Sequence, residues 1–347
     1  MNIDVNTLQG ITFDGHDVQG LVLNGVTLWT KTSGGGDDPG DTTDYFTVEV
    51  LSGTNISVFI KPLANEYKCT WYIWKNSIPN ANKDNYTLGP FTPTNGTNGD
   101  SSEVSSIKVS AGDKLRFYRA EQTSLTGSAD TTHYRQNLYC SDTNAELKIY
   151  GNIASLMGFS NYCMDYGLCS LFATNANWGT APIIDASGLI FPWDNLSYYS
   201  YVFYNMFYGN IKLVYGPTSL PATSIGSSAY RQMFYNCQNL ISVADVLPAT
   251  TIGGTAYRGM FYNCKNLEKA PVIVGNPGGS NTCREMFFGC TKLNWIKNLA
   301  TQYSSGIYTN WVSGVSAIGT FIRNPNVTWS TGNSGIPSGW TVQTATE

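Results

Sequence analysis

Apolar and polar positions follow two different periods along the chain. Between residues 204 and 293, large apolar residues return at intervals of 27, 27 and 26, as Met206, Met233, Met260 and Met286 mark. A phenylalanine follows each of these methionines, and a leucine stands seven residues after each. A period in the twenties is typical of a solenoid in which each coil is one short supersecondary unit. One unit buries too little apolar surface to fold alone, so the pattern predicts that the units stack.

Within each unit, the segment around Met-Phe-Tyr-Asn-Cys predicts a short helix. Met260 and Cys264 stand at i and i+4, which places both side chains on one helical face directed at the core. The run that follows predicts a short strand, limited by Pro271. The stripe of Met, Phe, Tyr and Leu side chains could also be a cofactor or ligand box, but burial of each such side chain contributes roughly 1.5–3 kcal/mol, which favours a core. The predicted repeat core consists of Met206, Phe207, Met233, Phe234, Cys237, Met260, Phe261, Cys264, Met286, Phe287 and Cys290.

The cysteines follow the repeat and do not form an obvious disulfide framework. Cys237, Cys264 and Cys290 share one repeat position, which predicts a buried ladder of small side chains. A metal site would need paired CxxC motifs or nearby histidines, so we expect no metal. Pairing of Cys163 with Cys169, or of Cys69 with Cys140, stays open.

Three arginines also recur in register, two residues before a methionine. Arg231, Arg258 and Arg284 are compatible with two interpretations. They could form a charged ridge for an anionic ligand, or a solvated edge on which arginine stems cover aromatic surface. The second interpretation is favoured.

Residues 45–150 alternate apolar and polar positions with the period of two that β-strands have. The runs lie at 46–50, 56–60, 67–73, 107–109, 114–119 and 147–149. Turns rich in Gly, Asn and Pro separate them, which predicts an antiparallel β-sandwich. The turn-rich segment from Pro79 to Ser102 predicts a long exposed loop.

The N-terminal region contains two short alternating runs. They are interrupted by Asp14-Gly15 and Asn24-Gly25, dipeptides that favour the tight turns of β-hairpins. Two small hairpins are not stable alone, so they need a partner surface, either another protein or the same chain. Residues 33–44 are rich in Gly and Asp and predict a hydrated tether.

The period stops after Leu299, and the remaining residues predict an irregular cap over the last repeat. The predicted fold is mainly β with an α/β solenoid. Its parts are a hairpin module (1–32), a linker (33–44), an antiparallel β-sandwich (45–150), leucine-rich repeats (151–298) and a C-terminal cap (299–347).

Composition and charge exclude further classes of function. Charged residues make up 13% of the chain and the net charge is −4, which offers no basic field for nucleic acid. A continuous run of 18 apolar residues is absent from the sequence, so we expect no membrane insertion. The N-terminus lacks the pattern of a secretory leader, which predicts synthesis and assembly in the cytosol.

Catalytic motifs are missing from the sequence. His16 and His133 have no partner motif, and neither a phosphate-binding loop nor a nucleophile elbow is found. We therefore expect no enzyme, and we assign no catalytic, cofactor-binding or metal-binding residue.

Two repeat segments carry a resemblance to a known family. Tyr257-Arg-Gly-Met-Phe-Tyr-Asn-Cys-Lys-Asn-Leu267 and Leu247-Pro-Ala-Thr-Thr-Ile252 resemble BspA-like leucine-rich-repeat proteins of Bacteroidetes and their phages. The resemblance covers about residues 45–347 and implies surface exposure, adhesion and ligand recognition. Leu23-Asn-Gly-Val-Thr-Leu-Trp29 more weakly resembles short β-modules at the start of phage virion proteins.

Together these resemblances imply a structural phage virion protein, a tail or head fibre or appendage used in host recognition. Residues 1–32 would contact other virion proteins, and the rest would meet a glycan or protein of the host surface. Appendages of this kind are often trimers, which makes a homotrimer an expected assembly. The predicted anchoring residues are Phe13, Asp14, Gly15, Leu23, Asn24, Gly25 and Trp29.

The alternative is a bacterial cell-surface adhesin or glycan-binding module whose secretion leader has been removed. The Tyr- and Asn-rich composition suits carbohydrate. Tyr198, Tyr199 and Tyr201 would then offer aromatic faces to sugar rings, although packing in the core or in turns explains them equally well.

Overall fold

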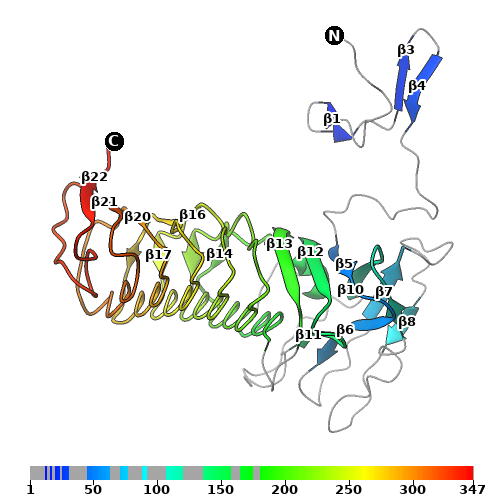
Figure 1. Cartoon of the computed structure of the whole chain (residues 1–347), viewed down its shortest axis with the longest axis horizontal. Coiled ribbons are helices and arrows are strands. Elements are labelled where there is room, and N and C mark those ends of the chain that lie inside the picture. The colour runs from blue at the N-terminus through cyan, green and yellow to red at the C-terminus, as the bar shows by residue number, and fades with distance from the viewer. Residues whose placement is uncertain are drawn as a thin grey trace.

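The computed structural model shows a mainly β protein (Figure 1). It describes residues 45–62, 71–76, 88–91, 107–119, 136–157, 165–174 and 180–346, together with the backbone of four short strands between residues 12 and 30. Within this part of the chain, the one helical element is the 3-10 helix η2 (Ile153–Met157). The same residues contain no helix with the length and apolarity needed to cross a bilayer.

The four N-terminal strands form two antiparallel pairs where two hairpins are predicted. Strand β1 (Thr12–Phe13) pairs with β2 (His16–Asp17), and β3 (Gly20–Leu23) pairs with β4 (Val26–Thr30).

Two sheets follow, and both contribute to one buried core. The larger has the order β13-β12-β5-β10-β7-β8 and the smaller the order β11-β6-β9. Their strands are β5 (Phe46–Ser52), β6 (Ile56–Pro62), β7 (Trp71–Lys75), β8 (Leu88–Phe91), β9 (Lys108–Val109), β10 (Lys114–Arg119), β11 (Gln136–Cys140), β12 (Glu146–Asn152) and β13 (Ile183–Ile190). Alternate apolar residues of β5, β6 and β12 belong to this core, as the period of two predicts.

The prediction of a long exposed loop over Pro79–Ser102 is wrong for Leu88–Phe91, which form strand β8. It pairs antiparallel with β7, at the edge of the larger sheet. The segment contains Gly89 and Pro90 and therefore looks like a turn in the sequence. Proline is tolerated in an edge strand, where one side needs no hydrogen-bond partner.

The larger sheet connects to the repeats through isolated parallel bridges. Strand β12 pairs parallel with β13, and bridges from Asp185 to Tyr215 and from Tyr215 to Ser242 carry the pairing onward. The smaller sheet makes a similar connection, because Leu138 N–H donates to the Leu171 carbonyl at 2.8 Å. The sheets thus cover the first coil of the repeat region.

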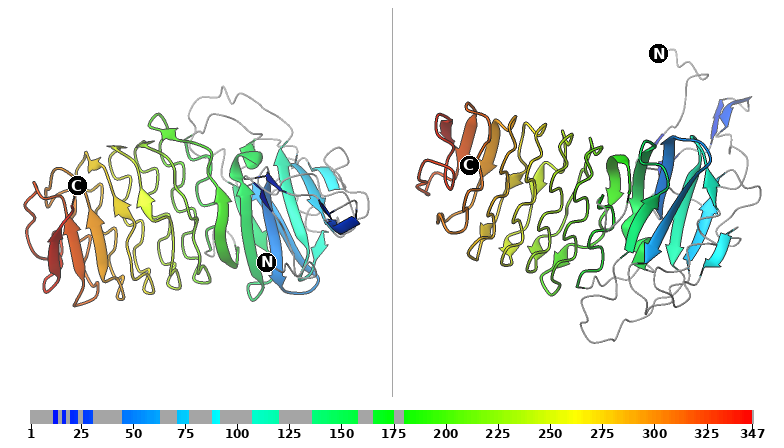
Figure 2. Two further views of the ribbon diagram at one scale, coloured as in Figure 1. Left: turned by 90° about the horizontal axis from the view of Figure 1, so that it is seen from above. Right: turned by 60° about the horizontal axis from the view of Figure 1, so that its bottom comes forward.

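The repeats form a stack of coils that extends away from the sheets (Figure 2). Short parallel strands line one side of the stack. One row consists of β14 (Asn195–Leu196), β15 (Ser224–Ile225), β17 (Thr251–Ile252) and β19 (Asn276–Pro277). A second row consists of β16 (Val246–Leu247), β18 (Val272–Ile273), β20 (Trp295–Asn298), β21 (Thr320–Arg323) and β22 (Thr341–Thr344).

The predicted short helices are wrong, and with them the α component of the predicted α/β solenoid. Each Met-Phe-Tyr-Asn-Cys segment is a run of tight turns along the long edge of the stack opposite the strands (the lower edge in Figure 1). Successive N–H groups alternate in their partner. Met233 N–H donates to the Tyr230 carbonyl three residues back at 3.2 Å, and Phe234 N–H donates to the Met260 carbonyl of the next coil at 2.8 Å.

A left-handed residue at every fourth position maintains this run of turns. In one coil these residues are Ser228, Gln232 and Asn236, with φ of 55°, 56° and 62°. Such a conformation costs about 1–2 kcal/mol in a residue other than glycine, and it excludes a continuous helix. The hydrogen bonds to the next coil offset this cost. A four-residue turn repeat leaves the i, i+4 pair on one side, which is why the sequence resembled a helix.

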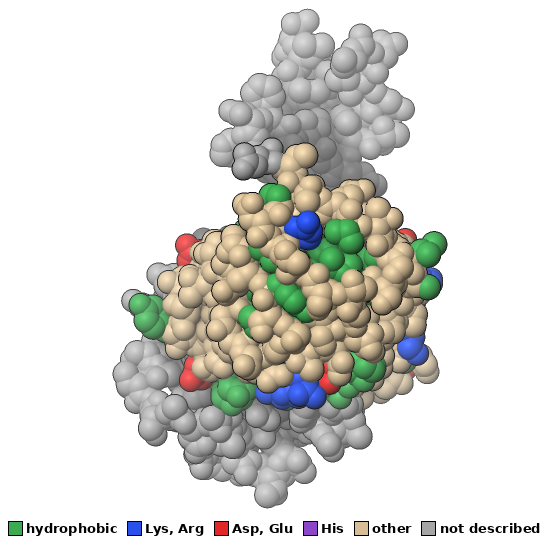
Figure 3. Space-filling view, turned by 90° about the vertical axis from the view of Figure 1, so that its left-hand side faces the viewer, with side chains coloured by type: hydrophobic (Ala, Val, Ile, Leu, Met, Phe, Trp, Pro, Cys, Tyr) green, Lys and Arg blue, Asp and Glu red, His purple; other side chains and the backbone are tan. Residues whose placement is uncertain are grey.

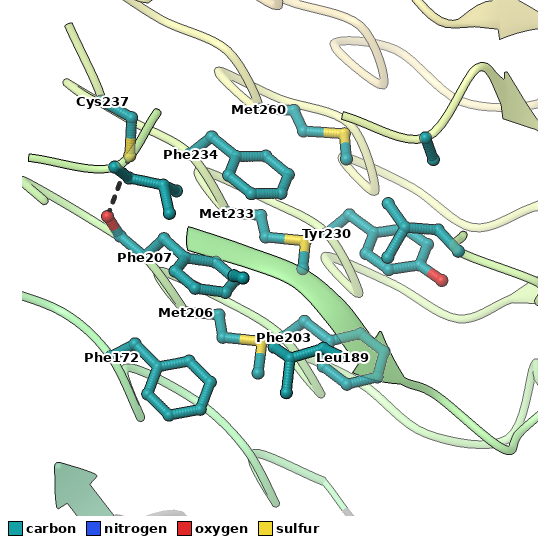
Figure 4. Close-up of a cluster of buried hydrophobic side chains, with 14 of the residues drawn as sticks. Phe172, Leu189, Phe203, Met206, Phe207, Tyr230, Met233, Phe234, Cys237 and Met260 are labelled. Atoms are coloured by element: carbon teal, nitrogen blue, oxygen red, sulfur yellow. Dashed lines mark hydrogen bonds between the residues drawn. The ribbon is translucent and has the colours of Figure 1, made fainter. Parts of the chain in front are cut away.

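The core of the stack consists of identical side chains in file (Figure 4). Phe207, Phe234 and Phe261 stack with ring centroids 5.3 and 5.4 Å apart, and Met206, Met233 and Met260 form a parallel file. All of these side chains have 0% exposure. Burying each contributes roughly 1.5–3 kcal/mol relative to solvent.

The coils continue beyond Leu299, which corrects the prediction that the period stops there. Strand β20 pairs parallel with β21, and β21 pairs parallel with β22. The motif fades because Trp311, Trp329 and Tyr308 replace the regular Met and Phe files as a cluster of large rings. The end face of the stack is largely polar around a small apolar centre (Figure 3).

Candidate ligand-binding face

The turn segments carry a row of aromatic rings on their outer side. Tyr208, Tyr235, Tyr262 and Phe288 stack with ring centroids 4.8, 4.4 and 4.8 Å apart and interplanar angles of 4°, 8° and 5°. All are half-buried. Their faces cover one another within the row, so a ligand would meet the ring edges rather than the ring faces.

Burial and crowding affect the chemistry of this row. Burial, followed by the neighbouring Tyr262 and Tyr208, raises the pKa of Tyr235 to about 12. The Tyr235 hydroxyl therefore stays protonated near neutrality and can act as a hydrogen-bond donor as well as an acceptor.

A second outer row contains the arginines that share a register. Arg231, Arg258 and Arg284 stand four residues before the aromatic row, and Tyr204 precedes them in the first coil. The Arg231 guanidinium lies over the Tyr204 ring, 5.4 Å from its centroid. One arginine of the row thus covers aromatic surface through its guanidinium group.

The positive charge of the arginine row is only partly neutralised by acidic side chains. Burial and then the charges of Arg231 and Arg284 lower the pKa of Arg258. The Nε atoms of Arg231 and Arg284 are buried without an acceptor. Glu285 is the sole acid in the turn segments 200–210, 227–237, 254–264 and 280–290, and its Oε1 lies 3.4 Å from Nη2 of Arg284.

The predicted repeat-core residues lie behind this face rather than on it. Each of the methionines, phenylalanines and cysteines predicted there has 0% exposure. The cysteines form a ladder in which Cys237 Sγ donates to the Phe207 carbonyl at 3.1 Å and Cys290 Sγ to the Phe261 carbonyl at 2.9 Å. Asn210 occupies the same position in the earlier coil and donates Nδ2 to the Ala181 carbonyl at 2.9 Å.

The third residue of the motif was assigned incorrectly. The sequence placed the motif tyrosines in the core stripe, whereas Tyr235 and Tyr262 lie on the outer row. Side-chain type alone gives no signal for this placement, because Tyr230 and Tyr257 of the same coils are buried.

The tyrosines considered for sugar stacking occupy three different environments. Tyr198 is 85% exposed, and Tyr199 packs against the core. Tyr201 stacks on Tyr166, with ring centroids 4.6 Å apart. They do not form a common aromatic platform.

The cysteines and the histidine considered in the sequence lie partly inside and partly outside the described residues. Cys140 and Cys169 are buried, and their candidate partners Cys69 and Cys163 lie outside the described residues. His133 also lies outside them. A search of the described part for three or more metal-binding side chains in one group finds none.

The predicted anchoring residues also lie outside what the structure describes in side-chain detail. The backbone of Phe13, Leu23 and Trp29 belongs to β1, β3 and β4. The remaining predicted anchoring residues are Asp14, Gly15, Asn24 and Gly25, which fall in the undescribed segments between those strands.

The chain matches no protein-family model, no curated protein and no solved structure.

Proposed function

We propose that the chain is a non-enzymatic recognition protein of a phage particle, anchored by its N-terminal module. The observation that carries the proposal is the outer face of the coil stack, where tyrosines and arginines recur in rows from coil to coil. A repetitive face along a rigid stack suits an extended surface ligand, since repeat proteins bind through such surfaces.

The class proposed for the stack is the BspA-like leucine-rich repeat. The coil interval of 26–27 residues supports it. So does the file of leucines at the seventh position after each methionine, Leu213, Leu240, Leu267 and Leu293, with exposures of 0–1%. The absence of helices from the described coils makes these repeats richer in turns than an α/β solenoid.

The proposed anchor is the pair of small antiparallel strand pairs between residues 12 and 30. Such short pairs bury little surface alone and need a partner. The Gly- and Asp-rich composition of residues 33–44 supports a spacer between anchor and recognition domain.

Mass spectrometry of purified particles of the encoding phage tests this proposal. The chain should be found in the particles, and a variant lacking residues 1–32 should be lost from them. Thermal unfolding of that variant, matched to the full chain, would show that the loss reflects anchoring. Recovery of the chain only from bacterial envelopes would instead support the adhesin alternative.

A further inference from the structure

The arginine row gives the outer face a local charge opposite to that of the whole protein. The turn segments contain three arginines and one acid, a net charge of 3 − 1 = +2, in a chain of net charge −4. The three arginines are half-buried, and the Nε atoms of Arg231 and Arg284, which solvent does not reach, have no acceptor within the protein. An external anion would offset this concentration of like charge.

The spacing of the row indicates a repeating ligand. The aromatic rings of successive coils lie 4.4–4.8 Å apart, so a cation and a neighbouring hydroxyl recur at about that interval. A linear polymer with one acidic group per unit can contact several coils at once. Multiple weak contacts of this kind add through effective concentration.

The aromatic row indicates what else the ligand carries. Because the rings cover one another, stacking on sugar rings or bases is not the main mode available to Tyr235 and Tyr262. Their hydroxyls can exchange hydrogen bonds with a ligand rich in hydroxyl groups. Duplex DNA fits less well, since its deoxyribose strands present no free hydroxyl groups to the tyrosine row.

We infer that Arg231, Arg258 and Arg284, with the hydroxyls of Tyr235 and Tyr262, form a binding site for a linear acidic polysaccharide. This inference rests on the proposed recognition function and names the class of its ligand. The bound groups are carboxylates or sulfates, held by guanidinium groups, with sugar hydroxyls on the tyrosine row.

The test measures binding of the full chain to immobilised polygalacturonate, dextran sulfate and neutral dextran, with duplex DNA as a further probe. We expect binding to at least one acidic polysaccharide and weaker binding to dextran and to DNA. The double variant R231Q/R258Q should lose between about tenfold and a hundredfold in affinity. Arg258→Lys, which keeps the charge, should lose less.

The matched control is Lys269→Gln. Lys269 is 57% exposed and pairs with the 85% exposed Asp245 outside the turn segments. The Lys269→Gln substitution removes one positive charge and should leave the affinity for the acidic polysaccharides unchanged. Circular dichroism and thermal unfolding compare the fold of every variant with that of the original chain.

Two results would overturn the inference. One is binding of the unmodified chain to dextran or DNA as tight as to both acidic polysaccharides. The other is unchanged affinity of a folded R231Q/R258Q variant. Neither result would contradict the proposed recognition of a host surface. Adsorption of the chain to host cells tests that function separately.

Discussion

The thiol of Cys264 donates a hydrogen bond to the backbone carbonyl of Phe234, 3.1 Å away. Phe234 lies in the neighbouring coil, so a side chain of one repeat satisfies the main chain of the previous one. Cys237 and Cys290 repeat the contact. The cysteine position therefore links coils and is more than a small filler of the core.

Removing this contact should destabilise the stack. Cys264→Ala leaves the Phe234 carbonyl without its thiol donor and opens a small cavity, which together cost about 1–3 kcal/mol. Urea unfolding followed by circular dichroism measures the loss. Lys265→Ala, at the exposed neighbouring position, should change stability by no more than about 0.5 kcal/mol. Equal effects of the two substitutions would refute the role of the thiol.

The buried thiols also predict a dependence of stability on alkaline pH. Burial raises the pKa of Cys237, Cys264 and Cys290 above the ordinary value of 9.0. The folded state keeps these protons while the unfolded state loses them, so the free energy of unfolding is greatest below pH 9 and falls as pH rises above it. Reductant keeps the thiols unmodified during the measurement.

Urea unfolding at pH 7.5, 9 and 10 checks this sign. Cys237→Ala, which removes one titrating group, should reduce the decline between pH 9 and 10. A free energy of unfolding that is constant or rising across this interval would contradict the prediction. Tyr235, with its pKa raised to about 12, acts in the same direction at pH above its ordinary value of 10.

Two adjacent glycines should respond differently to the same substitution. A Cβ at Gly253 would lie 2.5 Å from the Gly226 carbonyl carbon in the neighbouring coil, whereas a Cβ at Gly254 meets nothing within 4 Å. Gly253→Ala forces two coils apart and should cost more than about 2 kcal/mol. Gly254→Ala should be neutral or slightly stabilising. Thermal unfolding of both variants decides whether coil spacing is as tight as described.

The continuity of the larger sheet with the coils predicts that they unfold together. Phe172 has 0% exposure. Its ring centroid lies 5.5 Å from that of Phe46 in β5 and 5.1 Å from that of Phe207 in the stack. Phe172→Ala should cost about 3–5 kcal/mol.

Hydrogen exchange read by mass spectrometry should then show faster exchange in two peptides, one containing residues 46–52 and one containing residues 203–207. Tyr198→Ala, at an 85% exposed side chain, should change neither peptide. A loss of protection confined to one of them would mean that sheets and stack are separate folding units.

The interior could be predicted from the sequence more readily than the outer face. Met233, Phe234 and Cys237 recur at a fixed interval, and apolar residues with such a period have few alternatives to a common core. Their local conformation was harder to predict, because a turn repeat of four residues and a helix both place Met260 and Cys264 on one side. Left-handed Gln232 or Ser228 leaves no distinctive mark in the sequence.

The outer face was missed for a different reason. Tyr235 and Tyr262 belong to the same motif as the core residues, and side-chain type alone does not separate a stacked outer ring from a buried one. The last coils were missed because Trp311 and Trp329 replace the regular files, and β8 because Gly89 and Pro90 resemble a turn. In each case tertiary contacts override the local pattern.

In the proposed function, the outer face of the coil stack recognises a host surface for a phage particle. Competition for adsorption measures this most directly: host cells are incubated with the purified full chain, and adsorption of the encoding phage is then counted. We predict that the chain lowers adsorption in a dose-dependent manner, and that a folded R231Q/R258Q variant competes at least about tenfold less well. Unchanged phage adsorption at a concentration of the chain that saturates the cells would contradict the proposed recognition of the host surface.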